Sequence, residues 1–228
     1  MEQRQAGRIW NEKSFQYMKI GALKKLSLID YPWKLSAVIF TQGCNFRCGF
    51  CHNPQLVLPD FFEETIPEKT IFDYLSKRIN RIEGVVISGG EPTLHHDLPE
   101  FIKKIKGLNY PVKLDTNGSN PKMLKMLIDE NILDFIAMDI KASFDMYSQL
   151  CSVDINTDII SESISLIKNS SVENQFRITL LKGVHDSRQT SDIENTFGIK
   201  LHLQYFKNSS SLLSNKFNES HVFLEDEF

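Results

Sequence analysis

Short apolar runs alternate with amphipathic stretches along most of the chain. The apolar runs are rich in β-branched residues and end at turn-forming residues, as buried strands do; they cover 36–40, 84–87, 112–114, 134–138, 176–181 and 201–206. The stretches between them carry apolar residues at helical spacing, and several open with Pro in the first turn; they cover 67–79, 98–105, 121–128 and 159–167. Because strand and helix alternate about six times, we expect parallel strands joined by crossover helices.

Two architectures fit this alternation, an open doubly wound sheet and a complete or partial (β/α) barrel. In both, functional residues follow the carboxyl ends of the strands, and the unusual residues of this chain stand there: Cys44, the Gly-Gly-Glu-Pro segment 89–92, and the segments 115–118 and 139–141. Polar groups converging from most strand ends are typical of a barrel mouth. About six units are too few for a closed barrel of eight strands, so the sequence favours an α/β fold of the partial (β/α)6 barrel type.

The pattern divides the chain into three regions. Residues 1–18 are predicted to form an N-terminal arm, and 19–207 the core domain, in which 19–31 adds a strand or hairpin before the first core strand. Residues 208–228 are rich in Ser and Asn and then acidic, so we expect a weakly ordered tail.

Composition narrows the possible partners. The 228 residues are 41% hydrophobic and 24% charged, as in folded soluble proteins, and the net charge of -3 gives no general attraction to nucleic acid or to anionic membranes. The chain has neither a signal-peptide core nor an uncharged apolar run of about 18 residues. We therefore expect a cytoplasmic protein without nucleic-acid or membrane partners, in a compartment where clustered thiols serve more often as metal ligands or catalysts than as disulfides.

Three of the four cysteines are close together in the sequence. Cys44, Cys48 and Cys51 form a Cys-x3-Cys-x2-Cys triplet. With His52 as a fourth ligand they could hold a structural zinc ion, whereas as the only ligands of a 4Fe–4S cluster they would leave one iron open to a substrate. The spacing alone leaves both possibilities open. The fourth thiol, Cys151, stands alone and is interpreted as a packing residue.

The triplet, with an aromatic residue before its third cysteine, resembles the defining motif of the radical S-adenosylmethionine (SAM) superfamily. The Cys-His-Asn-Pro continuation at 51–54, the Leu-Ser-Leu-Ile-Asp-Tyr-Pro segment at 26–32 and the Phe-Thr-Gln-Gly-Cys segment at 40–44 make the chain similar to glycyl-radical-enzyme activases, in particular anaerobic ribonucleoside-triphosphate reductase activating proteins. The resemblance implies that Cys44, Cys48 and Cys51 hold the cluster and that S-adenosylmethionine binds its open iron. Reductive cleavage of this cofactor would then yield a 5′-deoxyadenosyl radical that abstracts a hydrogen atom.

The same resemblance assigns residues to the cofactor. Gly89, Gly90 and Glu91 match a motif whose backbone and carboxylate hold the amino group of the cofactor. The later strand-end motifs, which contact its ribose, carboxylate and adenine, supply Asp115, Thr116, Asn117, Asp139, Lys141, Arg177 and one of the pair His202 and Gln204. The two Asp residues and Thr116 are also candidate ligands of a monovalent cation. Without the resemblance, the same residues would be interpreted as turns, ion pairs and polar core residues.

The sequence therefore predicts an oxidoreductase that generates a glycyl radical on a partner enzyme similar to anaerobic ribonucleotide reductase, with flavodoxin or ferredoxin as the electron donor. No cysteine lies between residues 52 and 150, so we expect a single cluster, with no catalytic residue beyond its ligands. One alternative is an enzyme with the same core that acts on a small metabolite such as a nucleobase precursor. The other is a zinc-binding interaction protein, which the strand-end motifs disfavour.

Overall fold

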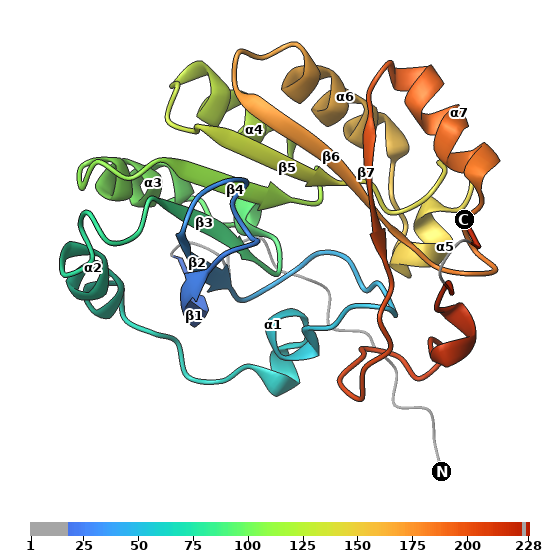
Figure 1. The fold of residues 1–228 in the computed structure, drawn as a ribbon, viewed down its shortest axis with the longest axis horizontal. Helices are drawn as coiled ribbons and strands as arrows, with labels where there is room; N and C mark the ends of the chain where they lie inside the picture. Colours follow the sequence, from blue (N-terminus) through green and yellow to red (C-terminus); the bar gives the residue numbers. More distant parts are fainter. Residues whose placement is uncertain (1–17, 225–226) are drawn as a thin grey trace.

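A computed structural model describes residues 18–224 and 227–228, so the predicted arm lies outside the described residues except for Met18. The described chain forms one seven-stranded sheet whose strands lie side by side in chain order (Figure 1). The strands are β1 (Ile20–Ser27), β2 (Ser36–Thr41), β3 (Gly84–Gly89), β4 (Val112–Thr116), β5 (Phe135–Asp139), β6 (Glu173–Leu180) and β7 (Leu201–Tyr205).

The strand order decides between the two predicted architectures. β1, a single strand within the segment 19–31, runs antiparallel to β2, and every later pair is parallel. A doubly wound sheet would reverse its strand order at a switch point, whereas this sheet winds in one direction from β2 to β7. Because β1 and β7 are its two unpaired edges, the sheet is open, and the predicted partial barrel is confirmed.

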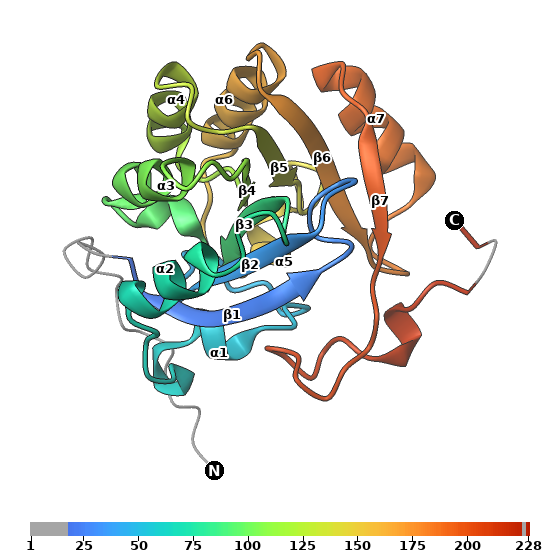
Figure 2. The ribbon, with the colours of Figure 1, turned by 60° about the vertical axis from the view of Figure 1, so that its left-hand side comes forward.

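Helices cover the convex side of the sheet, where Figure 2 shows α3, α4, α6 and α7 in an arc. The helices are α1 (Pro54–Val57), α2 (Glu68–Ser76), α3 (Leu98–Lys106), α4 (Pro121–Asp129), α5 (Tyr147–Cys151), α6 (Thr157–Lys168) and α7 (Ser187–Phe197); 3-10 turns span Pro59–Phe61, Pro92–Leu94 and Glu219–His221. Among residues 18–224 and 227–228, no helix is long and apolar enough to cross a bilayer.

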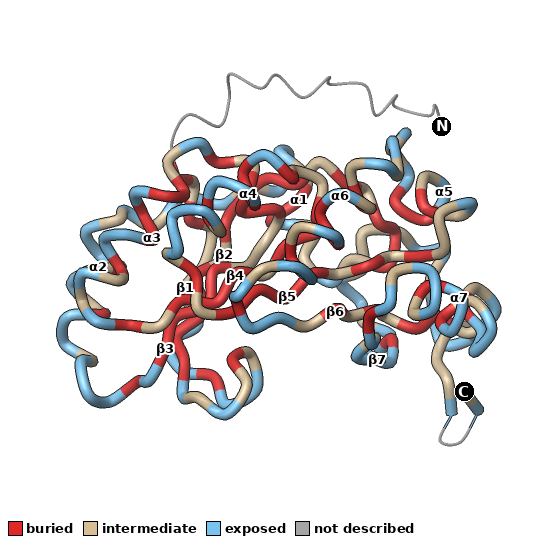
Figure 3. Tube along the Cα trace, turned by 90° about the horizontal axis from the view of Figure 1, so that it is seen from above, coloured by how far each residue is buried: buried red, intermediate tan, exposed pale blue. Residues whose placement is uncertain are grey.

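The two faces of the sheet differ in chemistry because strand side chains alternate between them. Residues such as Ile39, Leu114 and Ile178 belong to the main core on the convex face, and β2 to β5 are buried along most of their length (Figure 3). The concave face begins with a small apolar cluster that includes Val86 and Phe135. Charged side chains continue this face toward the carboxyl ends of the strands, so the interior of the partial barrel is partly ionic.

Candidate active site

A cavity of about 740 Å³ lies at the carboxyl edge of the sheet. Its lining brings together the polar residues predicted from successive strand ends: Cys44, Cys48, Cys51, Gly89, Gly90, Glu91, Asp115, Thr116, Asn117, Asp139 and Lys141. Segments separated by about 100 residues in the chain therefore meet at one place, as expected for the mouth of a partial barrel.

The loop after β2 that carries Cys44, Cys48 and Cys51, called the cysteine loop below, presents thiols that accept hydrogen bonds. The backbone N–H of Phe46 donates to Cys44 Sγ at 3.4 Å, and that of Asn53 donates to Cys51 Sγ at 3.5 Å. Burial raises the pKa of Cys44 to about 12, so this thiol stays protonated at neutral pH unless a metal centre takes up the sulfur. Thiol sulfurs that accept hydrogen bonds from backbone N–H groups fit an iron–sulfur cluster, whose ligand sulfurs accept such bonds.

A mononuclear zinc site does not fit the same loop. His52, the candidate fourth ligand, binds the backbone carbonyl of Lys207 through Nε2 at 2.6 Å and lies against the ring of Phe206. Across the described ranges, 18–224 and 227–228, no three His, Cys, Asp or Glu side chains converge on a point where one ion could sit. In a cluster each thiolate binds a different iron, so its sulfurs stand apart.

Gly89 and Gly90 bring two strand ends into close contact. A Cβ atom on Gly90 would lie 1.9 Å from the carbonyl oxygen of Gly43, and one on Gly89 would lie 2.3 Å from the backbone nitrogen of Thr41. Gly89 also has a φ of +122°, which favours glycine. The sequence suggested that these glycines let the backbone approach a ligand; the structure shows that they first allow the approach of the neighbouring cysteine loop.

Glu91 joins the third and fourth strand ends. Its Oε1 accepts from the Thr93 backbone at 3.1 Å, from Thr93 Oγ1 at 2.6 Å and from Thr116 Oγ1 at 2.8 Å, while Oε2 accepts from the Asn117 backbone at 2.6 Å. Burial raises the pKa of Glu91, and these four bonds oppose that effect. A carboxylate has about four acceptor positions, so the capacity that remains for a cofactor ammonium group lies on Oε2.

Asn117 links the fourth strand end to the cysteine loop. Its Nδ2 donates to Asn45 Oδ1 at 3.0 Å and lies 3.9 Å from Cys44 Sγ. Asn45 in turn donates from Nδ2 to Ser119 Oγ at 2.8 Å. Sequence reasoning missed Asn45 and Ser119, although Asn45 directly follows the first cysteine. A side-chain N–H beside a cluster ligand is one of the groups by which a protein adjusts the potential of a cluster.

Five charged side chains form a continuous network on the concave face. Arg177 donates from Nε to Asp139 Oδ1 at 2.7 Å, and its Nη1 lies 3.4 Å from Asp115 Oδ1. Lys141 Nζ binds Asp139 Oδ2 at 3.1 Å, and Lys113 Nζ binds Asp115 Oδ1. Burial favours the neutral form of Asp139, but Arg177 and Lys141 outweigh it and lower the pKa of that carboxyl. Arg177 therefore spans both Asp residues from just beneath the cavity.

The network includes a residue that sequence reasoning missed. Lys113 is 2% exposed, points to the concave face and lies 6.0 Å from the centre of the Phe135 ring. A lysine inside an apolar strand is costly unless it is paired. The same signal drew attention to Arg177, so Lys113 could have been found from the sequence.

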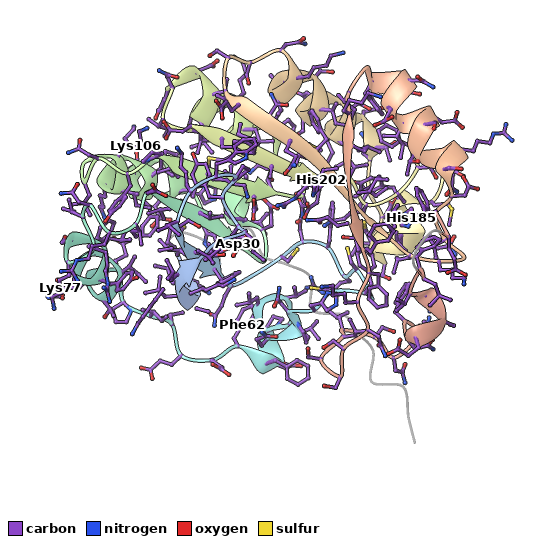
Figure 4. All side chains as sticks on the ribbon, viewed as in Figure 1. Asp30, Phe62, Lys77, Lys106, His185 and His202 are labelled. Atoms are coloured by element: carbon purple, nitrogen blue, oxygen red, sulfur yellow. The ribbon has the colours of Figure 1, made fainter. Side chains whose placement is uncertain are left out.

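His185 is a second missed residue, and no sequence signal marked it. Its Nδ1 accepts from the backbone of Leu181 at 3.0 Å, and its Nε2 donates to the carbonyl of Lys141 at 3.0 Å, which fixes the neutral tautomer. His185, labelled in Figure 4, thereby ties the segment after β6 to the cavity residue Lys141.

The last strand, β7, places Gln204, and not His202, in the cavity. Gln204 lines it together with Thr179, its partner on β6. His202, also labelled in Figure 4, is exposed and lines a separate pocket of about 450 Å³ that it shares with Lys168 and Gln175. Of the pair considered for adenine, the structure therefore favours Gln204.

The segment after β7 folds over the cysteine loop. The backbone of Leu213 donates to the carbonyl of Cys51 at 3.0 Å, and that of Ser214 donates to the carbonyl of Gly49 at 2.9 Å. Phe217 lies edge-on to Phe50, with ring centres 5.8 Å apart. A Cβ atom on Gly49 would lie 2.7 Å from the Phe217 ring, so glycine is needed for this contact. Residues 213–217 thus lie over the cysteine loop.

Comparisons with known proteins agree with this geometry. Residues 38–192 match the family model "Radical SAM superfamily". The chain is 37% identical over 183 residues to the "Putative glycyl-radical enzyme activating enzyme MJ1227" of Methanocaldococcus jannaschii, covering 78% of this chain and 74% of that protein. It is 30% identical over 139 residues to the pyruvate formate-lyase-activating enzyme of Listeria monocytogenes, covering 54% of this chain and 53% of that protein.

Solved structures share the fold. Streptococcus suis SuiB bound to S-adenosylmethionine superposes with a TM-score of 0.63 at 15% identity, and the match covers 82% of this chain and 42% of SuiB. At this identity the likeness concerns the fold alone.

Proposed function

The chain belongs to the radical SAM superfamily, and on that premise we propose that it activates a partner enzyme by generating a glycyl radical on it. Enzymes of this superfamily use a 4Fe–4S cluster and S-adenosylmethionine. The observation that carries the proposal is the convergence of three thiols, the Gly89–Glu91 turn and the Arg177 network on one cavity. The relatives named above are activating enzymes by name, which supports a protein substrate.

Different residues of this chain would hold the cluster and the cofactor. Cys44, Cys48 and Cys51 would ligate the cluster, which when bound supplies the electron that cleaves the sulfonium bond of the cofactor. The Gly89–Glu91 turn would accept hydrogen bonds from the cofactor ammonium group through backbone carbonyls and Glu91 Oε2. Lys141, at the mouth, would bind the cofactor carboxylate while Arg177 holds Asp139 in place.

The open edges of the sheet suit a protein substrate. The cavity is lined from the β1 side by Ile29 and Asp30 and from the β7 side by Tyr205 (Figure 4 labels Asp30). Ile29 is 84% exposed and Tyr205 is 52% exposed, so this part of the cavity is reachable from solvent. A glycine on an extended segment of a large partner could enter here, and the segment itself would exclude water from the radical.

We further propose the finer assignments that the sequence suggested. The partner is a glycyl-radical enzyme of the anaerobic ribonucleotide reductase type, and a low-potential flavodoxin or ferredoxin supplies the electron. The reaction takes place in the cytoplasm, since unligated thiols need a reducing compartment.

Cofactor cleavage tests the proposal. Protein reconstituted anaerobically and reduced should bind about four irons and convert S-adenosylmethionine to 5′-deoxyadenosine, and the reductase encoded in the same genome should increase this conversion. A reductase whose radical-site glycine is replaced by alanine is the matched control. Cleavage that responds to a small metabolite and not to the reductase would favour the small-molecule alternative; one bound zinc without cleavage would refute both.

A further inference from the structure

We propose that the ammonium group of Lys113, which binds Asp115 beneath the cavity, supplies the positive charge of a monovalent cation, so that this chain binds S-adenosylmethionine without an alkali ion. The inference rests on the cofactor-binding part of the proposed function. The sequence suggested Asp115, Thr116 and Asp139 as ligands of such an ion. In the structure, each of the three already binds side chains or backbone groups of the protein.

The candidate ligands have little capacity left for an ion. Thr116 Oγ1 donates to Glu91 and accepts from the backbone of Gly118 at 3.1 Å. Asp115 Oδ1 binds Lys113 and faces Arg177, and both oxygens of Asp139 are bound by Arg177 and Lys141. An alkali ion placed between the two carboxylates would meet three protein cations at short range, which is electrostatically unfavourable.

Charge balance points the same way. Lys113, Lys141 and Arg177 carry three positive charges against the two negative charges of Asp115 and Asp139, which leaves one positive charge in excess. Asp30 also acts on this network but is neutralised by Lys24 at 2.9 Å. The cofactor would bring three charged groups: its carboxylate would cancel this excess, its ammonium group would face Glu91, and its sulfonium would belong to the side of the cluster ligands. Without Lys113 the occupied site would instead carry one uncompensated negative charge.

The placement of Lys113 makes it a stable substitute for an ion. Its side chain is 2% exposed and extends from the middle of the sheet to Asp115, with the Phe135 ring on one side. A covalently attached ammonium group pays no entropy of ion capture and cannot exchange with solvent. Lys113 is thus a positioning residue, which acts on the cofactor through Asp115 and Arg177.

The test measures cofactor affinity as a function of the cation present. Cluster-loaded protein is titrated with S-adenosylmethionine in buffers of equal ionic strength that contain either potassium chloride or choline chloride. Wild-type protein is expected to give the same Kd in both. Lys113→Met should bind about tenfold more weakly in choline and recover in potassium, because an ion can then bind the freed Asp115 carboxylate at the cavity. Lys122→Met, at an exposed position of α4, is the matched control and should behave as wild type.

A double variant separates charge from folding. Lys113→Met with Asp115→Asn removes one charge of each sign, so the occupied site is balanced again and its Kd should not depend on potassium. Melting curves identify any variant that fails to fold, and the wild-type comparison alone then decides. A wild-type Kd that improves in potassium, or a folded Lys113→Met whose loss potassium does not reverse, would overturn the inference. Wild type that binds no cofactor in either salt would refute the proposed function itself.

Discussion

At the scale of single residues, Cys48 and Cys151 are neighbouring buried thiols with different expected roles. Their side chains are within hydrogen-bonding contact, and Cys48 lowers the acidity of Cys151, so that the pKa of the latter is raised. Only Cys48 belongs to the loop whose thiols line the cavity. The sequence distinguishes the two thiols by their spacing, but it could not show that α5 places Cys151 against the cysteine loop.

Cys48→Ala should therefore lose the cluster, whereas Cys151→Ala should keep about four irons per chain. Iron analysis and absorbance near 400 nm after anaerobic reconstitution measure both, with circular dichroism to confirm folding. Equal loss of iron from the two variants would show that Cys151 is a ligand, contrary to the interpretation of this residue as packing.

A second prediction for a single residue concerns the effect of Glu91 on stability. Glu91→Gln replaces an acceptor oxygen by an NH2 group in a site where Thr93, Thr116 and the Asn117 backbone all donate. The unmet donors should lower the free energy of unfolding by about 1–3 kcal/mol, measured by urea denaturation of the apoprotein. Glu100→Gln, at an exposed position of α3, should change it little; equal effects would show that the buried bonds contribute nothing.

At the scale of elements, the sequence predicted what depends on periodicity and missed what depends on contacts. β2, β3 and β5 are apolar for most of their length, so their positions followed from composition, whereas β4 carries Lys113 and Asp115 between its apolar residues. β6 begins at Glu173, before its apolar run, because its first residues face solvent. α7 buries only Thr190 and Ile193, too few to show a helical stripe, although the capping box of Asp186 and Gln189 was present in the sequence.

His185 connects the segment after β6 to Lys141 after β5, and its burial leads us to expect that stability depends on pH. Burial lowers the pKa of His185 below the usual histidine value near 6.5. The unfolded chain then binds the proton more readily, so stability is fully present above pH 6.5 and is lost as the pH falls toward the lowered pKa, by up to about 1.4 kcal/mol per pH unit.

Melting temperatures between pH 7.5 and 5.5 check this sign. The wild type should lose stability toward pH 5.5 more steeply than His185→Gln, whose overall stability is lower because the Leu181 and Lys141 bonds are disturbed. His96→Gln, at an exposed position, should keep the wild-type slope. Identical slopes for wild type and His185→Gln would rule out the proposed titration.

We expect the segment after β7 to protect the cluster from loss of iron. Phe217→Ala should remove the ring that covers Phe50 and Gly49, so an iron chelator should extract iron from the reconstituted protein faster. Phe61→Ala removes a ring that is 59% exposed and far from these contacts in the chain, and it should leave the rate unchanged. A rate that Phe217→Ala does not alter would show that the tail does not shield the site.

At the scale of the whole molecule, the open sheet connects fold to function. The motifs could be predicted to converge because parallel strands bring their carboxyl ends to one edge. The Lys113–Asp115 and Asp139–Lys141 pairs could also have been predicted, because side chains two residues apart on a strand share one face. The bridge from Arg177 to both Asp residues could not, because it depends on the register of β6 against its neighbours. The cavity that results is lined by the exposed residues Ile29, from the β1–β2 loop, and Tyr205, from β7, which is the feature that suits a segment of a large partner.

Electron paramagnetic resonance of the partner tests this account most directly. The reduced, cluster-loaded chain is mixed with S-adenosylmethionine and the anaerobic reductase, and the spectrum is recorded after the reductase has been separated from it. We expect a stable glycyl-radical signal on the reductase, accompanied by 5′-deoxyadenosine and absent when Cys48→Ala replaces the wild-type chain. Cleavage of S-adenosylmethionine without any radical on the reductase would contradict it.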